Sequence, residues 1–270
     1  EPGTPPDAAI FLDGQATTEL TPADPIVNGV AFGVQWTFRR DLSFEGSSVH
    51  FVLSTETFRP GAEGVHRLEW FSVDNRGNEE EHKFQAVAVD TTPPVTTLIV
   101  GAPQFTLPDR TLLVSSRTPF ALPAADPVAG GVASGWKDTF SRVTDGPSGA
   151  GGYLVYLGSF TLSGADTLKT IDFYSRDKVL NAEGVRSSTV LFDSTPPELA
   201  LQCPSEVESG ICRVFKGKFP VFGTAKDAHF REYRLEFAPG KNALQGFVTI
   251  QAATGPVTSG VLGVWDASAL

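Results

Sequence analysis

The sequence has no methionine, only two cysteines and few charged residues, and each shortage excludes a class of protein. Charged residues make up 19% of the 270 residues, and the net charge is −10. The densest basic site is Arg39-Arg40, which Asp41 follows. Nucleic acid binding requires clustered lysine and arginine side chains, so the sequence excludes nucleic acid as a partner. The acidic balance instead suits an exported, soluble protein.

Long hydrophobic runs are also missing. No run approaches 18 apolar residues, so the sequence predicts no transmembrane segment. No basic leader with an apolar segment opens the chain, and position 1 is not methionine. We therefore expect a mature or excised segment.

The motifs of common enzyme classes do not occur. The sequence has no Gly-x-Ser-x-Gly, no His-Glu-x-x-His and no phosphate-binding glycine loop. Gly131–Gly135 and Gly146–Ala150 only approximate the first motif, and both stand in glycine-rich loops. The sequence therefore predicts a protein that is not an enzyme and that carries no catalytic or cofactor-binding residues.

The two cysteines, Cys203 and Cys212, bracket a loop of eight residues. A disulfide across so short a loop would stabilise the fold by roughly 2–3 kcal/mol. A metal site is the alternative, but no Cys-x-x-Cys is present and the four histidines are scattered. We predict a structural disulfide, which places the chain in an oxidising, extracellular compartment.

What the sequence does contain is an internal repeat. Leu68–Asp74 reappears as Ile171–Asp177, and Asp90–Pro94 reappears as Asp193–Pro197, with every pair 103 positions apart. The chain is therefore predicted to be a tandem array, an organisation typical of spacers, scaffolds and adhesion modules.

Proline pairs divide this array. Pro5-Pro6, Pro93-Pro94 and Pro196-Pro197 each follow threonine, and consecutive prolines form short semi-rigid hinges. Between them, apolar residues alternate with polar ones in short segments, and no segment shows a sustained helical period. We predict an all-β fold of three tandem Ig-like or fibronectin-III-like β-sandwich domains in a beads-on-a-string array, spanning residues 1–92, 93–195 and 196–270.

Two longer stretches make the pattern specific. Gly64–Glu79 and Val89–Pro94 resemble the bacterial Ig-like repeats of large secreted and cell-surface proteins, in which a late hairpin is followed by an Asp-Thr-Thr-Pro-Pro linker. The second unit has Lys178–Asn181 in place of the glycine-containing turn, so its hairpin is expected to be wider.

The third unit resembles another common surface repeat, through Gly223–Asp227, Tyr233–Glu236 and Gly260–Asp266. Such repeats continue with a further strand. The third domain is therefore expected to be C-terminally incomplete, within a longer parent protein.

Repeated acidic residues suggest one binding chemistry. Asp74 and Asn78, with Asp177 and Asn181, offer oxygens of the kind that calcium prefers. The alternative is a structural turn, in which Asp and Asn side chains bond their own backbone. Glu79 and Glu183 lie in the same two segments. Asp90 and Asp193, beside the linkers, are candidates for calcium binding between domains, and the alternative for each is a residue that simply ends a strand.

Four tryptophans raise the possibility of sugar stacking, although one buried aromatic per sandwich is usual. Trp136 is the better candidate for an exposed ring and a ligand contact. It lies in residues 124–152, a Gly-, Asp-, Pro- and Ser-rich segment predicted to be a loop insertion of the second domain. Because grafted loops carry function more often than scaffolds, a binding site is expected there first.

These observations favour a non-catalytic structural or adhesive segment (stalk, fibre or filament module) of a bacterial extracellular or cell-surface protein. Its partners would be other copies of itself, neighbouring domains of a longer chain, or a surface glycan or protein. Edge strands offer a route to filament formation. The alternative is an accessory carbohydrate- or protein-binding region of a larger secreted hydrolase.

Overall fold

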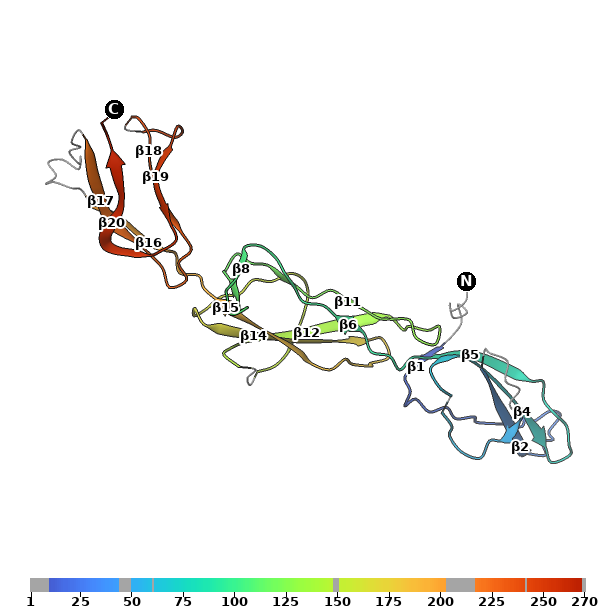
Figure 1. Ribbon diagram of the computed structural model, residues 1–270. Helices are drawn as coiled ribbons and strands as arrows, with labels where there is room; N and C mark the ends of the chain where they lie inside the picture. Colours follow the sequence, from blue (N-terminus) through green and yellow to red (C-terminus); the bar gives the residue numbers. More distant parts are fainter. Residues whose placement is uncertain are drawn as a thin grey trace. The chain divides into compact units, whose positions relative to one another are not determined.

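The computed structural model describes residues 10–43, 50–59, 61–147, 151–202, 217–240 and 242–268. All of its regular elements are β-strands, so the all-β prediction is confirmed (Figure 1). No helix occurs among these residues, and none of them therefore forms a helical membrane span.

Each sheet takes its strands from one of three intervals, residues 10–89, 95–192 or 198–266. The first two intervals are called here the first repeat and the second repeat. Compact packing divides the chain into two units, Glu1–Asp193 and Ser194–Leu270, so both repeats lie in the first unit. The number of independent domains, and their boundaries at residues 92 and 195, stay predictions.

The first repeat forms one five-stranded sheet with the order β1-β5-β4-β2-β3. β1 is parallel to β5, and the other pairs are antiparallel. A small core of Phe58, Leu68 and Val87 packs with Leu12, Leu20 and Trp70. The strands are β1 (Ile10–Leu12), β2 (Val34–Ser43), β3 (Val52–Leu53), β4 (Gly64–Asp74) and β5 (Lys83–Val89).

The second repeat forms a six-stranded sheet with the order β13-β12-β14-β15-β9-β8 and two short pairs, β10-β7 and β11-β6. Phe120 of β10 packs with Ile171, Val190 and Phe192 of the large sheet, so a second layer covers one face of it. The strands are β6 (Val95–Thr96), β7 (Ile99–Val100), β8 (Gln104–Thr106), β9 (Leu112–Val114), β10 (Phe120–Ala121), β11 (Ala124–Ala125), β12 (Trp136–Asp145), β13 (Leu154–Val155), β14 (Leu168–Asp177) and β15 (Arg186–Phe192).

The two repeats match strand for strand. β1, β2, β4 and β5 correspond to β9, β12, β14 and β15, and the residues that pair in one sheet pair at the matching register in the other. Residues 136–145 are thus a framework strand, not part of a loop insertion as the sequence suggested. Among the described residues, the second repeat also has β6, β7 and β8 before β9.

The expectation of a wider hairpin in the second repeat is wrong. Leu180 has φ = 77° where Gly77 has φ = 84°, so a leucine occupies the left-handed conformation that glycine adopts in the first repeat. The amides of both residues donate to the aspartate carbonyl three positions earlier, at 3.1 Å for Gly77 and 3.2 Å for Leu180. The backbone keeps one turn for both sequences.

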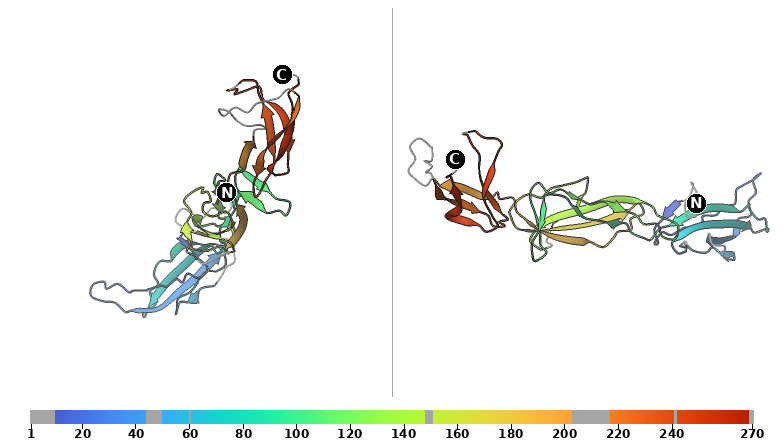
Figure 2. Two further views of the ribbon diagram at one scale, coloured as in Figure 1. Left: turned by 90° about the vertical axis from the view of Figure 1, so that its left-hand side faces the viewer. Right: turned by 45° about the horizontal axis from the view of Figure 1, so that its top comes forward.

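The second unit contains two sheets, β16-β17-β20 and β18-β19, which face one another (Figure 2). Its small core is formed by Ala225, Leu235 and Leu262. The predicted disulfide between Cys203 and Cys212 lies outside the described residues. The strands are β16 (Glu198–Gln202), β17 (Lys218–Lys226), β18 (Tyr233–Phe237), β19 (Val248–Ala253) and β20 (Val257–Asp266).

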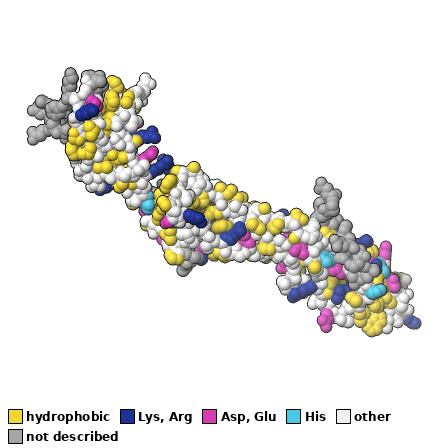
Figure 3. Space-filling view, in the orientation of Figure 1, with side chains coloured by type: hydrophobic (Ala, Val, Ile, Leu, Met, Phe, Trp, Pro, Cys, Tyr) yellow, Lys and Arg dark blue, Asp and Glu magenta, His cyan; other side chains and the backbone are white. Residues whose placement is uncertain are grey.

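Many hydrophobic side chains of the second unit remain at its surface, as Figure 3 shows for one face. Leu199 and Leu201 of β16 are each 70% exposed, and Val264 of β20 is 57% exposed. A small sheet with a solvated outer face accounts for such exposure, because folded proteins keep much apolar area at the surface.

Candidate functional site

The predicted calcium candidates occupy two equivalent turns. The carboxylate of Asp74 accepts hydrogen bonds from the backbone N–H of Asn78 at 2.9 Å and from its side-chain amide at 2.7 Å. Asp177 and Asn181 make the same two contacts at 2.8 Å and 2.7 Å. Hydrogen bonds from the Asn78 side chain and backbone lower the pKa of Asp74. These contacts are those of the structural-turn interpretation; binding of calcium at either turn stays a prediction.

The two turns differ in their surroundings. Asp177 is fully buried, and next to it lie two further aspartates, Asp90 from the end of β5 and Asp126 from the loop before β12. One carboxylate oxygen from each of the three residues lies within 4.8 Å of the others. The second repeat therefore holds a cluster of three aspartates, called here the aspartate triad.

Backbone amides position the triad. Ser134 donates its N–H to Asp90 Oδ2 at 2.6 Å, and Gly135 donates its N–H to Asp126 Oδ2 at 2.6 Å. The Asn181 side chain donates to the Asp90 carbonyl at 2.9 Å as well as to Asp177. Asn181 thereby ties Asp90 of the linker to the turn that follows β14.

The triad is strongly negative. Burial raises the pKa of Asp126 above its ordinary value, and the charges of Asp90, Asp177 and Glu63 raise it further, against the hydrogen bond from Gly135. A carboxyl group whose pKa is raised on folding destabilises the native state when it is ionised. That destabilisation is largest above the folded pKa of Asp126 and is relieved as the pH falls.

The sequence pointed to Asp90, Asp177 and Asn181 but missed Asp126. A signal for it was present, because Asp24-Pro25 and Asp126-Pro127 stand at equivalent places in the two repeats. Asp24 Oδ2 accepts from the N–H groups of Phe32 and Gly33, both at 2.8 Å, which parallels the contact of Asp126 with Gly135.

Trp136 is 44% exposed, and its indole N–H donates to Thr139 Oγ1 at 3.0 Å. Trp36, near the start of the corresponding β2, is 47% exposed. Exposure therefore does not distinguish Trp136 from Trp36, although the pairing register aligns Trp136 with Val34 and Trp36 with Asp138. In contrast, Trp70 packs against the first core.

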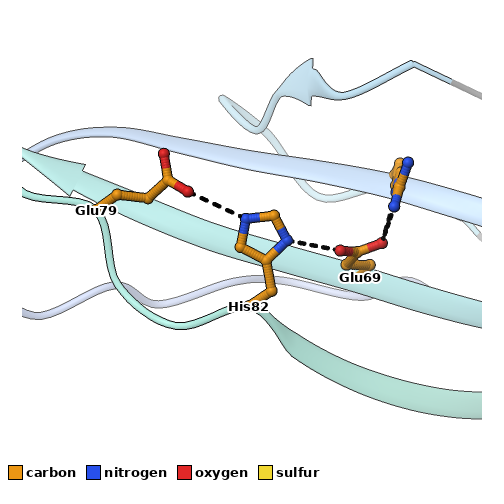
Figure 4. A network of polar contacts seen from close by, with 4 residues as sticks. Glu69, Glu79 and His82 are labelled. Atoms are coloured by element: carbon orange, nitrogen blue, oxygen red, sulfur yellow. Dashed lines mark hydrogen bonds and ion pairs between the residues drawn. The ribbon is translucent and has the colours of Figure 1, made fainter.

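A polar network on the first sheet brings together groups that enzymes use for proton transfer. His82 lies between Glu69 and Glu79, with nitrogen–oxygen distances of 2.6 Å and 3.2 Å, and Arg40 also binds Glu69 (Figure 4). The hydrogen bond to Glu69 raises the pKa of His82. Burial by itself would raise the pKa of Glu69. The hydrogen bonds from His82 and Arg40 outweigh this effect, and the pKa of Glu69 is lowered.

The second repeat has a related pair of contacts at the corresponding carboxylate. Asp172, at the position of Glu69, binds Arg142 Nε at 2.8 Å and accepts a hydrogen bond from Ser187. The buried carboxylate is therefore bound by a hydroxyl in the second repeat and by an imidazole in the first. The ring of His82 stacks on Phe71 with 4.3 Å between centroids, so one face of the imidazole is covered by the sheet's own side chains.

Comparison with known proteins places few limits on the chain. No family model matches the sequence, and no curated protein does. Among solved structures, the fibronectin(III)-like modules of CbhA from Clostridium thermocellum are similar, with 14% sequence identity and a TM-score of 0.34. The alignment covers 70% of this chain and 92% of that chain. The all-β assignment rests on the strand pairing of the chain itself.

Proposed function

We propose that the chain is a non-catalytic structural segment, a spacer within a longer extracellular or cell-surface protein. Its partners would then be neighbouring domains of the same chain or further copies of it. The observation that supports this role best is the linker between the repeats, residues 90–94, whose first three residues are bonded from both sides.

The first repeat holds the linker through Glu63. Its carboxylate accepts hydrogen bonds from Thr91 Oγ1 at 2.8 Å and from Thr92 Oγ1 at 2.6 Å. The second repeat holds the same linker at Asp90, through Ser134 and Asn181. A linker with such contacts limits bending, which is the property that a spacer requires.

Close packing reinforces these hydrogen bonds. A Cβ atom added to Gly130 would lie 2.7 Å from the carbonyl oxygen of Glu63, so the backbones of the two repeats approach as closely as glycine allows. Gly130 also has φ = 54° in the tight turn between Ala129 and Val132. The corresponding residue in the first repeat is Asn28, with φ = 53°.

The positions that recur in both repeats build the framework. The ion pairs Arg40–Glu69 and Arg142–Asp172, each with a buried carboxylate, correspond, as do the Phe38–Phe71 and Phe140–Tyr174 stacks. Repetition of sheet-building contacts favours a mechanical role. The accessory carbohydrate-binding alternative depended on Trp136, whose exposure Trp36 matches.

The test is the rigidity of the junction. Spin labels at the exposed residues Glu81 and Thr189 would report the distance between the repeats, with Cys203 and Cys212 replaced by serine. A spacer should give a narrow distance distribution. Gly130→Asn should broaden it, because asparagine tolerates the positive φ but its side chain collides with the Glu63 carbonyl.

Asn28→Gly is the matched control, since it changes the equivalent turn away from the linker and should leave the distribution unchanged. A distribution in the unmodified sequence as broad as that of Gly130→Asn would contradict the spacer role. An unchanged width in Gly130→Asn would show that the close approach of Gly130 to Glu63 does not hold the repeats.

A further inference from the structure

The aspartate triad has the composition and spacing of a site for a hard cation. We propose that Asp90, Asp126 and Asp177 bind a calcium ion at the junction of the two repeats. Such a site would bind calcium whether or not the chain serves as a spacer.

The geometry permits a shared ion. Calcium takes oxygen ligands at about 2.3–2.6 Å, so two oxygens on one ion lie at most about 5 Å apart. The three carboxylate oxygens of the triad lie within 4.8 Å of one another. They come from three segments far apart in sequence, namely the linker, the loop before β12 and the hairpin after β14.

The charge of the triad calls for a cation. Asp90 and Asp177 are fully buried, and among the described residues no lysine, arginine or histidine nitrogen lies within ion-pair distance of the three carboxylates. Lys178 directs its Nζ toward Gly135, and Glu63 adds another negative charge nearby. Buried carboxylates normally are paired or coordinate metals.

Two buried oxygens at the same place have no hydrogen-bond partner among the described residues. One is Asp126 Oδ1, which belongs to the triad. The other is Oγ of Ser134, a residue only 5% exposed. The N–H of Ser134 binds Asp90 and that of Gly135 binds Asp126, so the backbone of Ser134 adjoins the triad. Unpaired buried oxygens are costly unless a ligand satisfies them.

The ligand set favours calcium over magnesium. Calcium accepts six to eight oxygens in flexible geometry, so carboxylates from three separate segments, a nearby hydroxyl and water can complete its shell. Magnesium demands a near-ideal octahedron and retains most of its water. Sequence comparison provides an internal control, because Asp24 and Asp74 of the first repeat occupy the positions of Asp126 and Asp177.

The experiment is thermal unfolding of the 270-residue chain in EGTA, in CaCl2 and in MgCl2. At a hundredfold excess of calcium over its Kd, the melting temperature of the first unit should rise by about 5–10 °C. Asp126→Asn should have opposite effects on the melting temperature without and with calcium. In EGTA this variant should melt at a higher temperature than the unmodified chain, because it removes a repelled charge and keeps an oxygen for the Gly135 N–H.

In CaCl2 the Asp126→Asn variant should lose the calcium-dependent gain, whereas the matched variant Asp24→Asn should keep it. Calorimetric titration with CaCl2 should show one binding site fewer in Asp126→Asn than in Asp24→Asn. An unmodified chain that melts at the same temperature in EGTA and CaCl2 would overturn the proposal. A gain that survives Asp126→Asn would overturn it too, and an equal gain with MgCl2 would refute the preference for calcium.

Discussion

The two repeats share a framework but bury different amounts of side chain. In both, an arginine of one strand pairs with a buried carboxylate of the next, and an aromatic stack lies on the same sheet. In the described part of the chain, the second repeat also has β6 and β7, whose pairing with β11 and β10 forms a second layer. Among the described residues, the main core cluster of the second repeat contains eight buried residues and that of the first repeat contains three, so we expect the stability of the two repeats to differ although their strands match.

One pair of positions shows how the cores diverged. Thr18 and Phe58 form a backbone bridge in the first repeat, and Phe120 and Phe160 form the corresponding bridge in the second. Threonine thus stands where the second repeat has its most buried ring. Backbone pairing therefore determines the arrangement of strands in both repeats. The residues that face the core determine how much buried apolar area stabilises each repeat.

Removing the ring of Phe120 should have the largest effect. Phe120→Ala is expected to destabilise the second repeat by about 3–5 kcal/mol, because the side chain is fully buried and its loss leaves a cavity. Phe58→Ala should cost less, since Phe58 is 8% exposed and the Arg39 guanidinium covers one face of its ring. Hydrogen exchange of β15 and β5 peptides under increasing urea measures the two losses separately.

The same hydrogen-exchange experiment can contradict the predicted difference between the two cores. If Phe58→Ala lowered protection of β5 as much as Phe120→Ala lowers that of β15, the cores would be energetically alike and the second layer would add nothing. Phe120→Thr, which installs the residue type found at Thr18, should fall close to the alanine variant, because a hydroxyl gains no packing there.

The hairpin turns provide an effect of intermediate size. Leu180→Gly should stabilise the second repeat by about 0.5–1 kcal/mol, since glycine adopts φ = 77° without the strain that leucine bears. Gly77→Leu is the reverse change and should destabilise the first repeat. Urea unfolding of both variants measures this, and a loss of stability in Leu180→Gly would show that the exposed leucine contributes more through packing than it costs through strain.

Much of the frame was predictable from sequence. The period-two alternation in Leu68–Val73 and the recurrence of this segment at Ile171–Asp177 identified the central strands β4 and β14. Burial itself does not alternate throughout, since Lys169–Phe173 of β14 are all buried. The turn residues Asp74 and Asn78 were also identifiable, since their side chains bond a local backbone. These features depend on contacts near in sequence.

The remaining features depend on contacts between distant segments. Residues 124–152 are rich in turn formers and predicted a loop, yet cross-strand pairing with β14 makes residues 136–145 a strand. Leu180 gave no sign of a left-handed conformation, because the tertiary frame imposes it. Asp126 was missed for the same reason, since only folding brings it to Asp90 and Asp177.

The smallest expected difference is in the response to pH. Two histidines of the first repeat bind carboxylates. His66 contacts Asp41 at 3.0 Å, and this hydrogen bond raises the pKa of His66, as Glu69 does for His82. The second repeat has Lys169 at the position of His66, paired with Asp145 at 2.5 Å. The sequence has no histidine between residues 95 and 192, so of the two repeats only the first has imidazoles that bind carboxylates.

The sign follows from linkage. A histidine whose folded pKa is raised stabilises the native state fully below the unfolded value of about 6.5, and this contribution is lost as the pH rises through the folded pKa. Asp41 and Glu69, whose folded pKa values are lowered, stabilise the native state above the ordinary carboxyl value and lose that contribution in acid. The first repeat should therefore be most stable between about pH 4.5 and 6.5.

Hydrogen exchange at pH 6 and pH 8, corrected for intrinsic rates, should show β5 losing protection relative to β15. The effect should be small because the side chain of His82 is 33% exposed and solvent screens its ion pairs. Replacing both His66 and His82 with glutamine should remove the difference between the repeats, since an amide keeps hydrogen bonding without titrating. Equal loss of protection in β5 and β15, or a difference that persists in the double variant, would show that other groups control the response and that the two frames do not differ in this way.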